Sequence, residues 1–259
     1  MLRTKIQNKE KMTGTHLYLT DVTVARIIGM SGYDYVWVDL EHSYKPVESV
    51  LADIIALKAT GTAVLVRVPQ DDLTYTKKVL ELGVDGIIFP MIRTAEQANK
   101  LIASTLYPPY GTRGFGPMNA VDYGFQDAQE YVDNTKTNLC RFIQIEHVDA
   151  VKNLDEIMKN EFIDGYIFGA NDLSGSINEL GNVYGENNIA LIKECTEKLH
   201  AAGKYVGLST GEMGYEMLKY WSDMDIDMIS AGADYMFLRD GAVQCRKNLQ
   251  RAHVPAYKE

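Results

Sequence analysis

The sequence predicts a (β/α)8 barrel that occupies residues 1–259 as one domain. Short apolar runs alternate along the chain with longer segments of helical spacing, and this alternation is typical of βα units around a parallel sheet. Eight such units favour a closed barrel over an open, doubly wound sheet, and barrels of this class commonly extend to roughly 250 residues. The 46% hydrophobic and 24% charged residues are those of a globular chain with a full core.

The expected strands are rich in Val, Ile, Leu and aromatic residues, as strands buried on both faces should be. In chain order they are His16–Thr20, Tyr35–Glu41, Ala63–Val68, Gly86–Met91, Cys140–Glu146, Gly165–Gly169, Tyr205–Thr210 and Met228–Ala233.

The segments between these runs carry local signals of helices. Thr94 and Gln97 have the spacing of a capping box, in which the hydroxyl accepts the Gln97 N–H and the Gln97 side chain reaches back. Apolar residues recur every three or four positions over 148–158, which predicts one amphipathic helix. A similar stripe covers 189–199, and Gly203 can supply the left-handed residue that ends that helix.

One connection is too long for this pattern. Its part Tyr107–Pro117 contains prolines and glycines that exclude a regular helix or strand. A loop of this length in a compact domain is usually functional, and we expect a lid or a subunit contact. Arg113 lies in this loop, where it either binds the distal part of a substrate or holds a subunit interface.

Composition excludes several classes of function. The net charge of −9, without a cluster of Lys and Arg, argues against nucleic acid as the main partner. The three cysteines are odd in number and widely spaced, which is typical of free thiols and not of a disulfide framework or a CxxC metal site. No apolar run approaches the ~20 residues needed to span a bilayer, and the basic N-terminus lacks the apolar core of a signal peptide. We expect a cytoplasmic protein without a membrane partner.

Polar residues gather where the expected strands end, which is where barrels carry their chemistry. They are Asp39, Glu41, His42, Arg67, Gln144, Glu146, Asn171 and Asp172. A histidine beside a carboxylate suits proton transfer, and an arginine suits an anionic oxygen. Each residue alone would more often be a helix cap, a surface charge or a structural histidine. The prediction therefore depends on their coincidence at one rim. His16, His200 and His253 have no partner that the sequence identifies.

Glu146 and Asp172 follow two consecutive strands joined by a helix, so both lie at the same end of the sheet, close enough to share a cation. Carboxylates without His or Cys ligands suit a hard cation, which favours Mg²⁺ or Mn²⁺, with Co²⁺ or Zn²⁺ as possible substitutes. His147 adjoins Glu146, but successive residues leave a strand end in opposite directions, so it is not expected as a third ligand.

The chain resembles the metal-dependent, pyruvate-specific class II aldolases of the HpcH/HpaI family, which act on 4-hydroxy-2-oxo-heptanedioate and 2-keto-3-deoxy sugar acids. The matching segments occur in the family's order and cover about two-thirds of the chain. They are Tyr33–His42, Val64–Arg67, Gly83–Met91, Tyr107–Gly116, Ile143–Glu146 and Asp164–Ser174. The resemblance implies a (β/α)8 barrel whose last helix is exchanged between the subunits of a hexamer.

The resemblance also implies roles for the residues at the rim. Glu146 and Asp172 become the metal ligands. Arg67 and His42 become the catalytic pair, and Asp39 the residue that orients His42.

Further residues of the resemblance concern the substrate. Gln144 becomes a neighbour of the metal site that contacts the substrate, and the backbone N–H groups of Asn171 and Asp172 would hold the pyruvate carboxylate at the start of a helix. The family usually has Gly where Leu40 stands and Ala-Pro where Ser43-Tyr44 follows His42, and these departures concern the aldehyde acceptor.

The implied reaction cleaves or forms 4-hydroxy-2-oxo acids, with pyruvate and an aldehyde as the products of cleavage, through a metal-stabilised pyruvate enolate. The base is His42 or a metal-bound water that His42 activates. No lysine stands at an expected strand end, which argues against a Schiff-base mechanism.

Two other functions remain open. One is an acyl-CoA lyase of the malyl or citryl type, although the basic groups expected for CoA phosphates are not visible in the sequence. The other is an oligomeric metabolite-binding barrel without catalytic activity.

Overall fold

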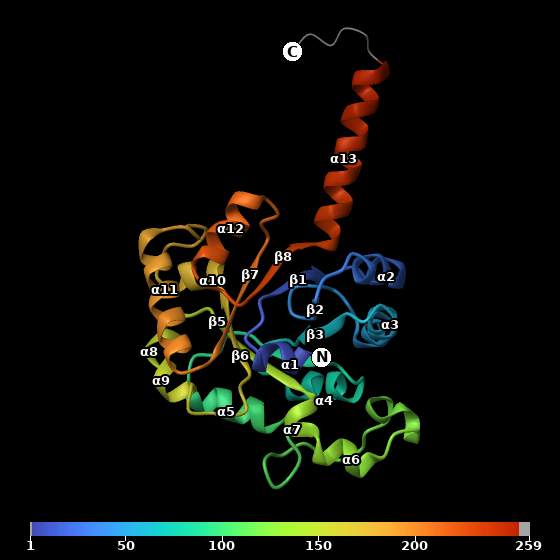
Figure 1. The fold of residues 1–259 in the computed structure, drawn as a ribbon, viewed down its shortest axis with the longest axis vertical. Coiled ribbons are helices and arrows are strands. Elements are labelled where there is room, and N and C mark those ends of the chain that lie inside the picture. Colours follow the sequence, from blue (N-terminus) through green and yellow to red (C-terminus); the bar gives the residue numbers. More distant parts are fainter. Residues whose placement is uncertain (1, 254–259) are drawn as a thin grey trace.

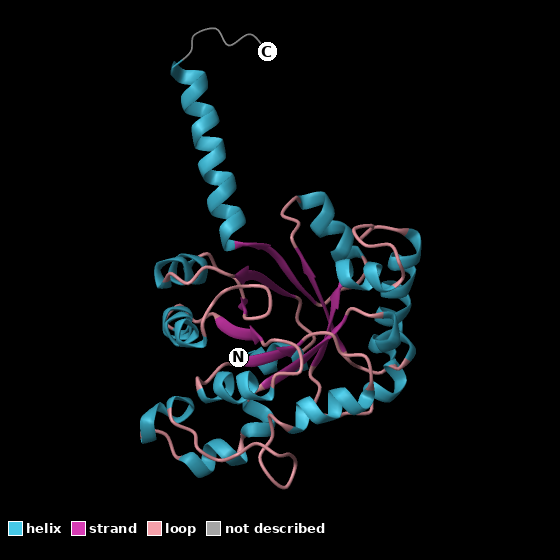
Figure 2. Ribbon diagram, turned by 180° about the vertical axis from the view of Figure 1, so that it is seen from behind, coloured by secondary structure: helices cyan, strands magenta, loops and turns pink. Residues whose placement is uncertain are grey.

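Eight parallel strands pair in chain order, and β8 pairs with β1, so that the sheet closes into a barrel surrounded by helices (Figures 1 and 2). The computed structural model describes residues 2–253. The strands are β1 (Met12–Leu17), β2 (Tyr35–Asp39), β3 (Ala63–Arg67), β4 (Gly86–Phe89), β5 (Cys140–Ile145), β6 (Gly165–Gly169), β7 (Tyr205–Thr210) and β8 (Met228–Ala233). The predicted (β/α)8 barrel is thereby confirmed.

Helices connect the strands or flank them at the chain ends, and most of them run back outside the barrel. They are α1 (Leu2–Gln7), α2 (Val22–Met30), α3 (Val47–Lys58), α4 (Leu73–Glu81), α5 (Ala95–Ala103), the 3₁₀ segment η1 (Asn119–Gly124), α6 (Ala128–Asp133), α7 (Thr135–Asn138), α8 (Val148–Lys152), α9 (Leu154–Ile157), α10 (Ala170–Ser176), α11 (Glu186–Ala201), α12 (Tyr215–Asp223) and α13 (Asp234–His253). No helix within residues 2–253 combines the length and apolar character needed to cross a bilayer.

The two faces of each strand belong to two separate cores. Valine, isoleucine and leucine side chains on the outer face pack under the helices. Below the carboxyl end of the barrel, the inner face is filled by large side chains such as Tyr35, Trp37, Leu65 and Phe142. Because side chains alternate between the faces with period 2, the next inward positions lie at the carboxyl end of the barrel, where polar residues replace apolar ones.

The first strand begins and ends earlier in the chain than the sequence predicts. It was expected at His16–Thr20, and it occupies Met12–Leu17. The segment after it is held as a loop, because the carboxylate of Asp234 accepts the backbone N–H groups of Tyr18 and Leu19 at 3.1 and 2.8 Å. His16 therefore lies at the carboxyl end of β1 and not at its start.

Two helix predictions need correction in detail. The expected helix over 148–158 is divided into α8 and α9 at Asn153. In the capping box, the Thr94 hydroxyl accepts the Gln97 N–H at 3.2 Å as expected. The Gln97 side chain, however, accepts the N–H of Arg93 at 2.8 Å and not that of Thr94. Gly203 adopts φ +73° just after α11, as predicted.

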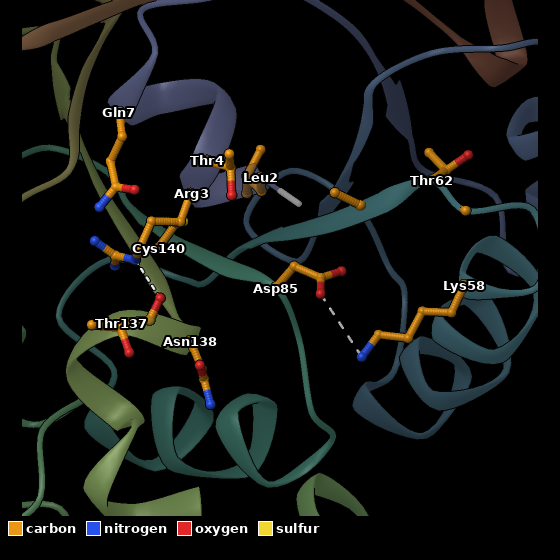
Figure 3. A pocket seen from close by; sticks show the side chains of 12 residues that line it. Leu2, Arg3, Thr4, Gln7, Lys58, Thr62, Asp85, Thr137, Asn138 and Cys140 are labelled. Atoms are coloured by element: carbon orange, nitrogen blue, oxygen red, sulfur yellow. Dashed lines mark hydrogen bonds and ion pairs between the residues drawn. The ribbon is translucent and has the colours of Figure 1, made fainter.

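The amino end of the barrel is closed by α1, which the sequence did not predict. Leu2 is buried against the inner core, and Arg3 pairs with Asp164 at 2.6 Å. A pocket of about 660 Å³ lies beside this helix, and Figure 3 shows its side chains, including Lys58 and Asp85. Burial raises the pKa of the Cys140 thiol in its wall to about 12, so this thiol stays protonated. No residue expected at the functional rim lines this pocket.

The last helix, α13, extends away from the barrel (Figures 1 and 2). Asp234, its first residue, is its one buried residue within the described part. Leu238, Val243 and Leu249 are exposed along the helix. A long helix that exposes apolar residues is typical of a subunit contact.

Candidate active site

A cleft of about 180 Å³ opens at the carboxyl end of the barrel, where the strands end and the βα loops begin. Six residues expected from the sequence line it: His42, Arg67, Gln144, Glu146, Asn171 and Asp172. The opposite wall comes from β1, β7 and β8 and includes His16 and Ser209. Asp39 lies beneath the cleft, and Arg113 lies elsewhere.

Arg67 is fixed by contacts on several sides. Its guanidinium pairs with Asp39, lies 3.2 Å from Glu41 Oε2, and donates to Gln144 Oε1 at 3.2 Å. It also stacks over the Trp37 ring at 5.1 Å. Burial acts to lower the pKa of Arg67, but the two carboxylates outweigh burial and raise it. The buried Nε–H has no partner among the described residues, so one donor is free for an oxygen of a ligand.

Asp39 acts on the backbone of His42 and not on its ring. Asp39 Oδ1 accepts the N–H groups of Glu41 and His42, each at 2.8 Å. The His42 side chain is 62% exposed at the mouth of the cleft, and its Nε2 lies 3.8 Å from Glu41 Oε2. Glu41 is therefore the carboxylate that faces the imidazole, which corrects the partner expected from the sequence. Burial raises the pKa of Glu41, and Arg67 opposes this shift.

Glu146 follows β5 and is buried at 2% exposure. Its Oε1 accepts the Met91 N–H at 2.6 Å, and its Oε2 accepts the Gln144 side-chain amide at 2.8 Å. Burial raises the pKa of Glu146 to about 8, and the nearby charge of Asp172 adds to the shift. A buried carboxylate of this kind is stabilised in its charged form by a cation.

Asp172 lies in the first turn of α10, exposed toward the cleft. It is close to Glu146 because β5 and β6 are neighbours, with Ile145 paired to Phe168. Within residues 2–253, no group of three or more His, Cys, Asp or Glu side chains is arranged to hold a metal. A cation held by these two carboxylates would have its other ligand positions filled by water or substrate, and such a donor set would fit Mg²⁺ or Mn²⁺.

Gly169 makes room for the carboxylate of Glu146. A Cβ added at Gly169 would lie 2.2 Å from Glu146 Oε2 and 2.9 Å from its Cβ. Glycine at the end of β6 thus permits the close approach of the two strands' ends.

Gly169→Ala is expected to weaken Mn²⁺ binding at least about tenfold, since the added methyl group displaces Glu146 from the cleft. Calorimetric titration of the metal-free protein measures this change. Gly214→Ala is the control, because Gly214 does not line the cleft and a Cβ at that position meets no atom within 4 Å. Equal Mn²⁺ affinities in the two variants would contradict the role of Gly169.

Arg113 does not reach this cleft in its own chain. It is buried and pairs with Glu81 at 2.9 Å, and its guanidinium lies 4.7 Å from the centre of the Tyr107 ring. Glu81 is the last residue of α4, and helices run opposite to the strands, so this cluster lies toward the amino end. The structure therefore does not support the role in substrate binding that the sequence suggests for Arg113. It also does not support a lid formed by Tyr107–Pro117 over the site of the same chain.

His147 and Asn171 are placed differently at the rim. His147 precedes α8 as its N-cap, where its Nδ1 accepts the Asp149 N–H at 3.1 Å. Asn171 lines the cleft at the start of α10. The first N–H groups of a helix have no partner within the helix and point toward its N-terminal side.

The sequence predicts no individual role for Glu41, His16 or Ser209. Glu41 stands in the same strand-end segment as Asp39 and His42, so its position could have been inferred. His16 and Ser209 lie on the inner face at the ends of β1 and β7. The period-2 alternation along correctly placed strands is the signal that identifies them.

Comparisons with known proteins find related chains. A sequence model described as HpcH/HpaI aldolase/citrate lyase matches residues 13–219. A hydroxypyruvate/pyruvate aldolase of Roseobacter denitrificans is 32% identical over 79% of this chain and 80% of its own. A 2-keto-3-deoxy-L-rhamnonate aldolase of Escherichia coli is 29% identical over 93% of this chain and 89% of its own.

Solved structures show the same architecture. An HpcH/HpaI aldolase from Desulfitobacterium hafniense superposes with a TM-score of 0.90 at 25% identity, covering 100% of this chain and 99% of its own. The citrate synthase SbnG has a TM-score of 0.84 at 22% identity, covering 98% of this chain and 99% of its own, and shows the shared fold alone.

Proposed function

Because the chain belongs to the HpcH/HpaI aldolase/citrate lyase family, and the relatives it matches are aldolases, which are carbon–carbon lyases, we propose that it is a divalent-metal-dependent class II aldolase. It cleaves or forms 4-hydroxy-2-oxo acids, with pyruvate or a close 2-oxo acid as the donor and an aldehyde as the acceptor. The observation that carries this proposal is the buried, unpartnered Nε–H of Arg67 in the same cleft as Glu146 and Asp172.

Glu146 and Asp172 would hold the cation, with Mg²⁺ or Mn²⁺ favoured by their oxygen ligands. When bound, the cation supplies Lewis-acid polarisation of the 2-keto oxygen. Gln144 holds Glu146 Oε2 in place, and the first N–H groups of α10, at Asn171 and Asp172, suit the carboxylate of the 2-oxo acid.

Arg67 would donate its free Nε–H to the keto oxygen, where negative charge develops as the C3–C4 bond breaks. Asp39 and Glu41 hold the guanidinium in place, so the donor is fixed before the substrate binds. His42 lies at the mouth of the cleft, where its ring can accept the proton of the C4 hydroxyl. Glu41 would then stabilise the protonated imidazole.

The assay is direct. Purified protein with Mg²⁺ or Mn²⁺ is expected to release pyruvate from 4-hydroxy-2-oxo acids, detected by coupling to lactate dehydrogenase. Activity that survives complete chelation, together with pyruvate that borohydride traps on the protein, would reject the metal-dependent mechanism.

The lining of the cleft does not favour acyl-CoA substrates. Among the described residues that line it, Arg67 is the only Lys or Arg, and its charge is balanced by Asp39 and Glu41. The phosphates of CoA would therefore find no basic partner there.

The exposed apolar residues of α13 support a homo-oligomer, and the resemblance favours a hexamer. Leu238→Glu is expected to reduce the oligomer to smaller species, because Leu238 is 65% exposed here and an added charge would be costly in a subunit contact. Sedimentation velocity measures the change. Gln244→Glu, on the same helix, is the control for an added charge, and an unchanged sedimentation coefficient in Leu238→Glu would contradict the contact.

A further inference from the structure

His16 and Ser209 form a polar pair in the wall of the cleft that comes from β1, β7 and β8. The proposed metal ligands and Arg67 belong to other strands and loops. The Nε2 of His16 lies 2.9 Å from Ser209 Oγ, and its Nδ1 lies 2.7 Å from the Gly232 carbonyl oxygen. The imidazole is 4% exposed and lies 5.2 Å from the Trp37 ring, the same ring over which Arg67 stacks.

Ser209 is placed close to the carboxylate side of the site. Its residue on β7 pairs with Gly169 on β6, the glycine that accommodates Glu146. The side chain is part-buried and borders the cleft. A group bound at Glu146, which follows β5, would therefore have Ser209 on β7, with only Gly169 on β6 between them.

The carbonyl of Gly232 fixes the direction of both hydrogen bonds. A carbonyl oxygen can only accept, so the His16 Nδ1 carries the proton. Nε2 of the neutral ring is then an acceptor, and the Ser209 hydroxyl donates to it. Because this hydroxyl proton is occupied, Ser209 Oγ presents only lone pairs to the cleft.

Burial keeps His16 neutral and so preserves this arrangement. It lowers the pKa of His16 to about 4, with Arg67 adding to the shift. At pH 7 only on the order of one imidazole in a thousand is protonated, so His16 is poorly suited to accept a proton from a substrate through Ser209. The pair is suited to recognition and not to acid–base chemistry.

We propose that the His16–Ser209 pair is a specificity device that accepts a hydrogen bond from a substrate hydroxyl group, either on the carbon of the 2-oxo acid that forms the new bond or on the aldehyde carbon next to the carbonyl. A methyl or methylene group at that position leaves Ser209 Oγ without a donor. A carboxylate or a carbonyl at that position has only acceptor oxygens, and these would be repelled by the lone pairs of Ser209 Oγ. The wall therefore favours hydroxylated substrates over their deoxy analogues.

This inference rests on the proposed aldolase function, and the hydroxyl can come from either partner of the reaction. It belongs to the 2-oxo acid in hydroxypyruvate, or to the aldehyde in glycolaldehyde. Two comparisons separate these sources. The first uses hydroxypyruvate against pyruvate with acetaldehyde as acceptor, and the second uses glycolaldehyde against acetaldehyde with pyruvate as donor.

In one of the two comparisons, kcat/KM is expected to be roughly tenfold or more higher for the hydroxylated compound. That comparison shows whether the hydroxyl belongs to the 2-oxo acid or to the aldehyde. Ser209→Ala is expected to lower this ratio about tenfold, while kcat/KM for the deoxy compound changes less than about threefold. Ser209→Thr retains the hydroxyl and is expected to keep most of the preference. His16→Phe retains the ring against Trp37, frees the Ser209 hydroxyl to donate, and is expected to lower the ratio as well.

Ser230→Ala is the matched control. Ser230 is an inward serine of the neighbouring strand, bonded to Tyr35 Oη at 2.8 Å and outside the cleft wall. Its removal is expected to leave the ratio unchanged. Ratios in Ser209→Ala that equal the wild-type ratios in both comparisons would overturn the proposal.

Failure of the aldolase function itself is recognised separately. If the wild-type protein with Mn²⁺ turns over none of these pairs, binding of the same four compounds is measured by saturation-transfer NMR in the wild type and in Ser209→Ala. If the wild type prefers the hydroxylated compounds in binding and Ser209→Ala loses this preference, the proposed role of the pair is supported without catalysis. If Ser209→Ala does not lose a hydroxyl preference, the proposal is overturned. Nitrogen-15 NMR of His16 in the wild-type protein is expected to show the Nδ1–H tautomer from pH 6 to 8, and the opposite tautomer would also overturn it.

Discussion

Replacing Glu146 by glutamine is expected to lower kcat about a thousandfold or more, because the variant loses the buried charge that would hold the cation in the cleft. Glutamine keeps the size of the side chain, so its contacts with Met91 N–H and Gln144 change little in shape. The lactate dehydrogenase assay gives kcat, and calorimetry gives the Mn²⁺ affinity. Glu212→Gln removes a carboxylate at the same rim but outside the cleft wall and is expected to keep both values. Full activity of Glu146→Gln would contradict the site.

The same variant also tests the electrostatics of the metal-free protein. Glu146 has a folded-state pKa of about 8 against an ordinary value of 4.5, so the folded state retains a proton that the unfolded state has lost between these values. The free energy of unfolding should therefore fall as pH rises from about 5 to 8, by on the order of a few kcal/mol. Glu146→Gln should remove this slope, as denaturation of the metal-free proteins at pH 5.5 and 8 would show.

Arg67→Lys is expected to lower kcat by about a hundredfold or more while the Mn²⁺ affinity stays within about threefold of wild type. Lysine keeps the positive charge between Asp39 and Glu41 but lacks the buried, unpartnered Nε–H. Activity and Mn²⁺ titration on the same sample separate the two effects. A parallel loss of Mn²⁺ binding would show instead that Arg67 supports the carboxylates.

Arg113→Lys is the natural comparison for this experiment. Arg113 is likewise buried, stacked on an aromatic ring and paired with a carboxylate, but at the other end of the barrel. Its replacement is expected to lower stability and to leave kcat near the wild-type value. A loss of kcat as large as that of Arg67→Lys would instead indicate that the Tyr107–Pro117 loop acts on the site of a neighbouring subunit.

The barrel and the two carboxylates could be predicted because both follow from simple periodicities. Buried parallel strands are continuous apolar runs, and residues just after them lie at one end of the sheet. Glu146 and Asp172 were found in this way. The same periodicity could not identify the partner of the His42 ring. The turn after β2 places Asp39 beneath the backbone and Glu41 beside the ring.

The other differences have equally local causes. Met12–Thr15 is too polar to indicate a strand by composition, while Tyr18 and Leu19 look like strand residues but are held by Asp234. His16 was therefore placed at the wrong end of β1, away from the rim. The length of its loop made substrate binding over the cleft one of the two roles expected for Arg113. A loop that follows the helix of a βα unit returns to the amino end, so chain order alone argues against that placement.

Trp37 lies under both halves of the cleft, with Arg67 stacked on its ring and His16 packed beside it. The carboxylates come from the ends of β5 and β6, whereas the His16–Ser209 pair comes from β1 and β7. Bond-breaking chemistry and substrate selection are thus assigned to different strands that share one rigid aromatic support. An engineer who wishes to change the accepted substrate can vary positions 16 and 209 together, and leave the strands that carry the reaction untouched.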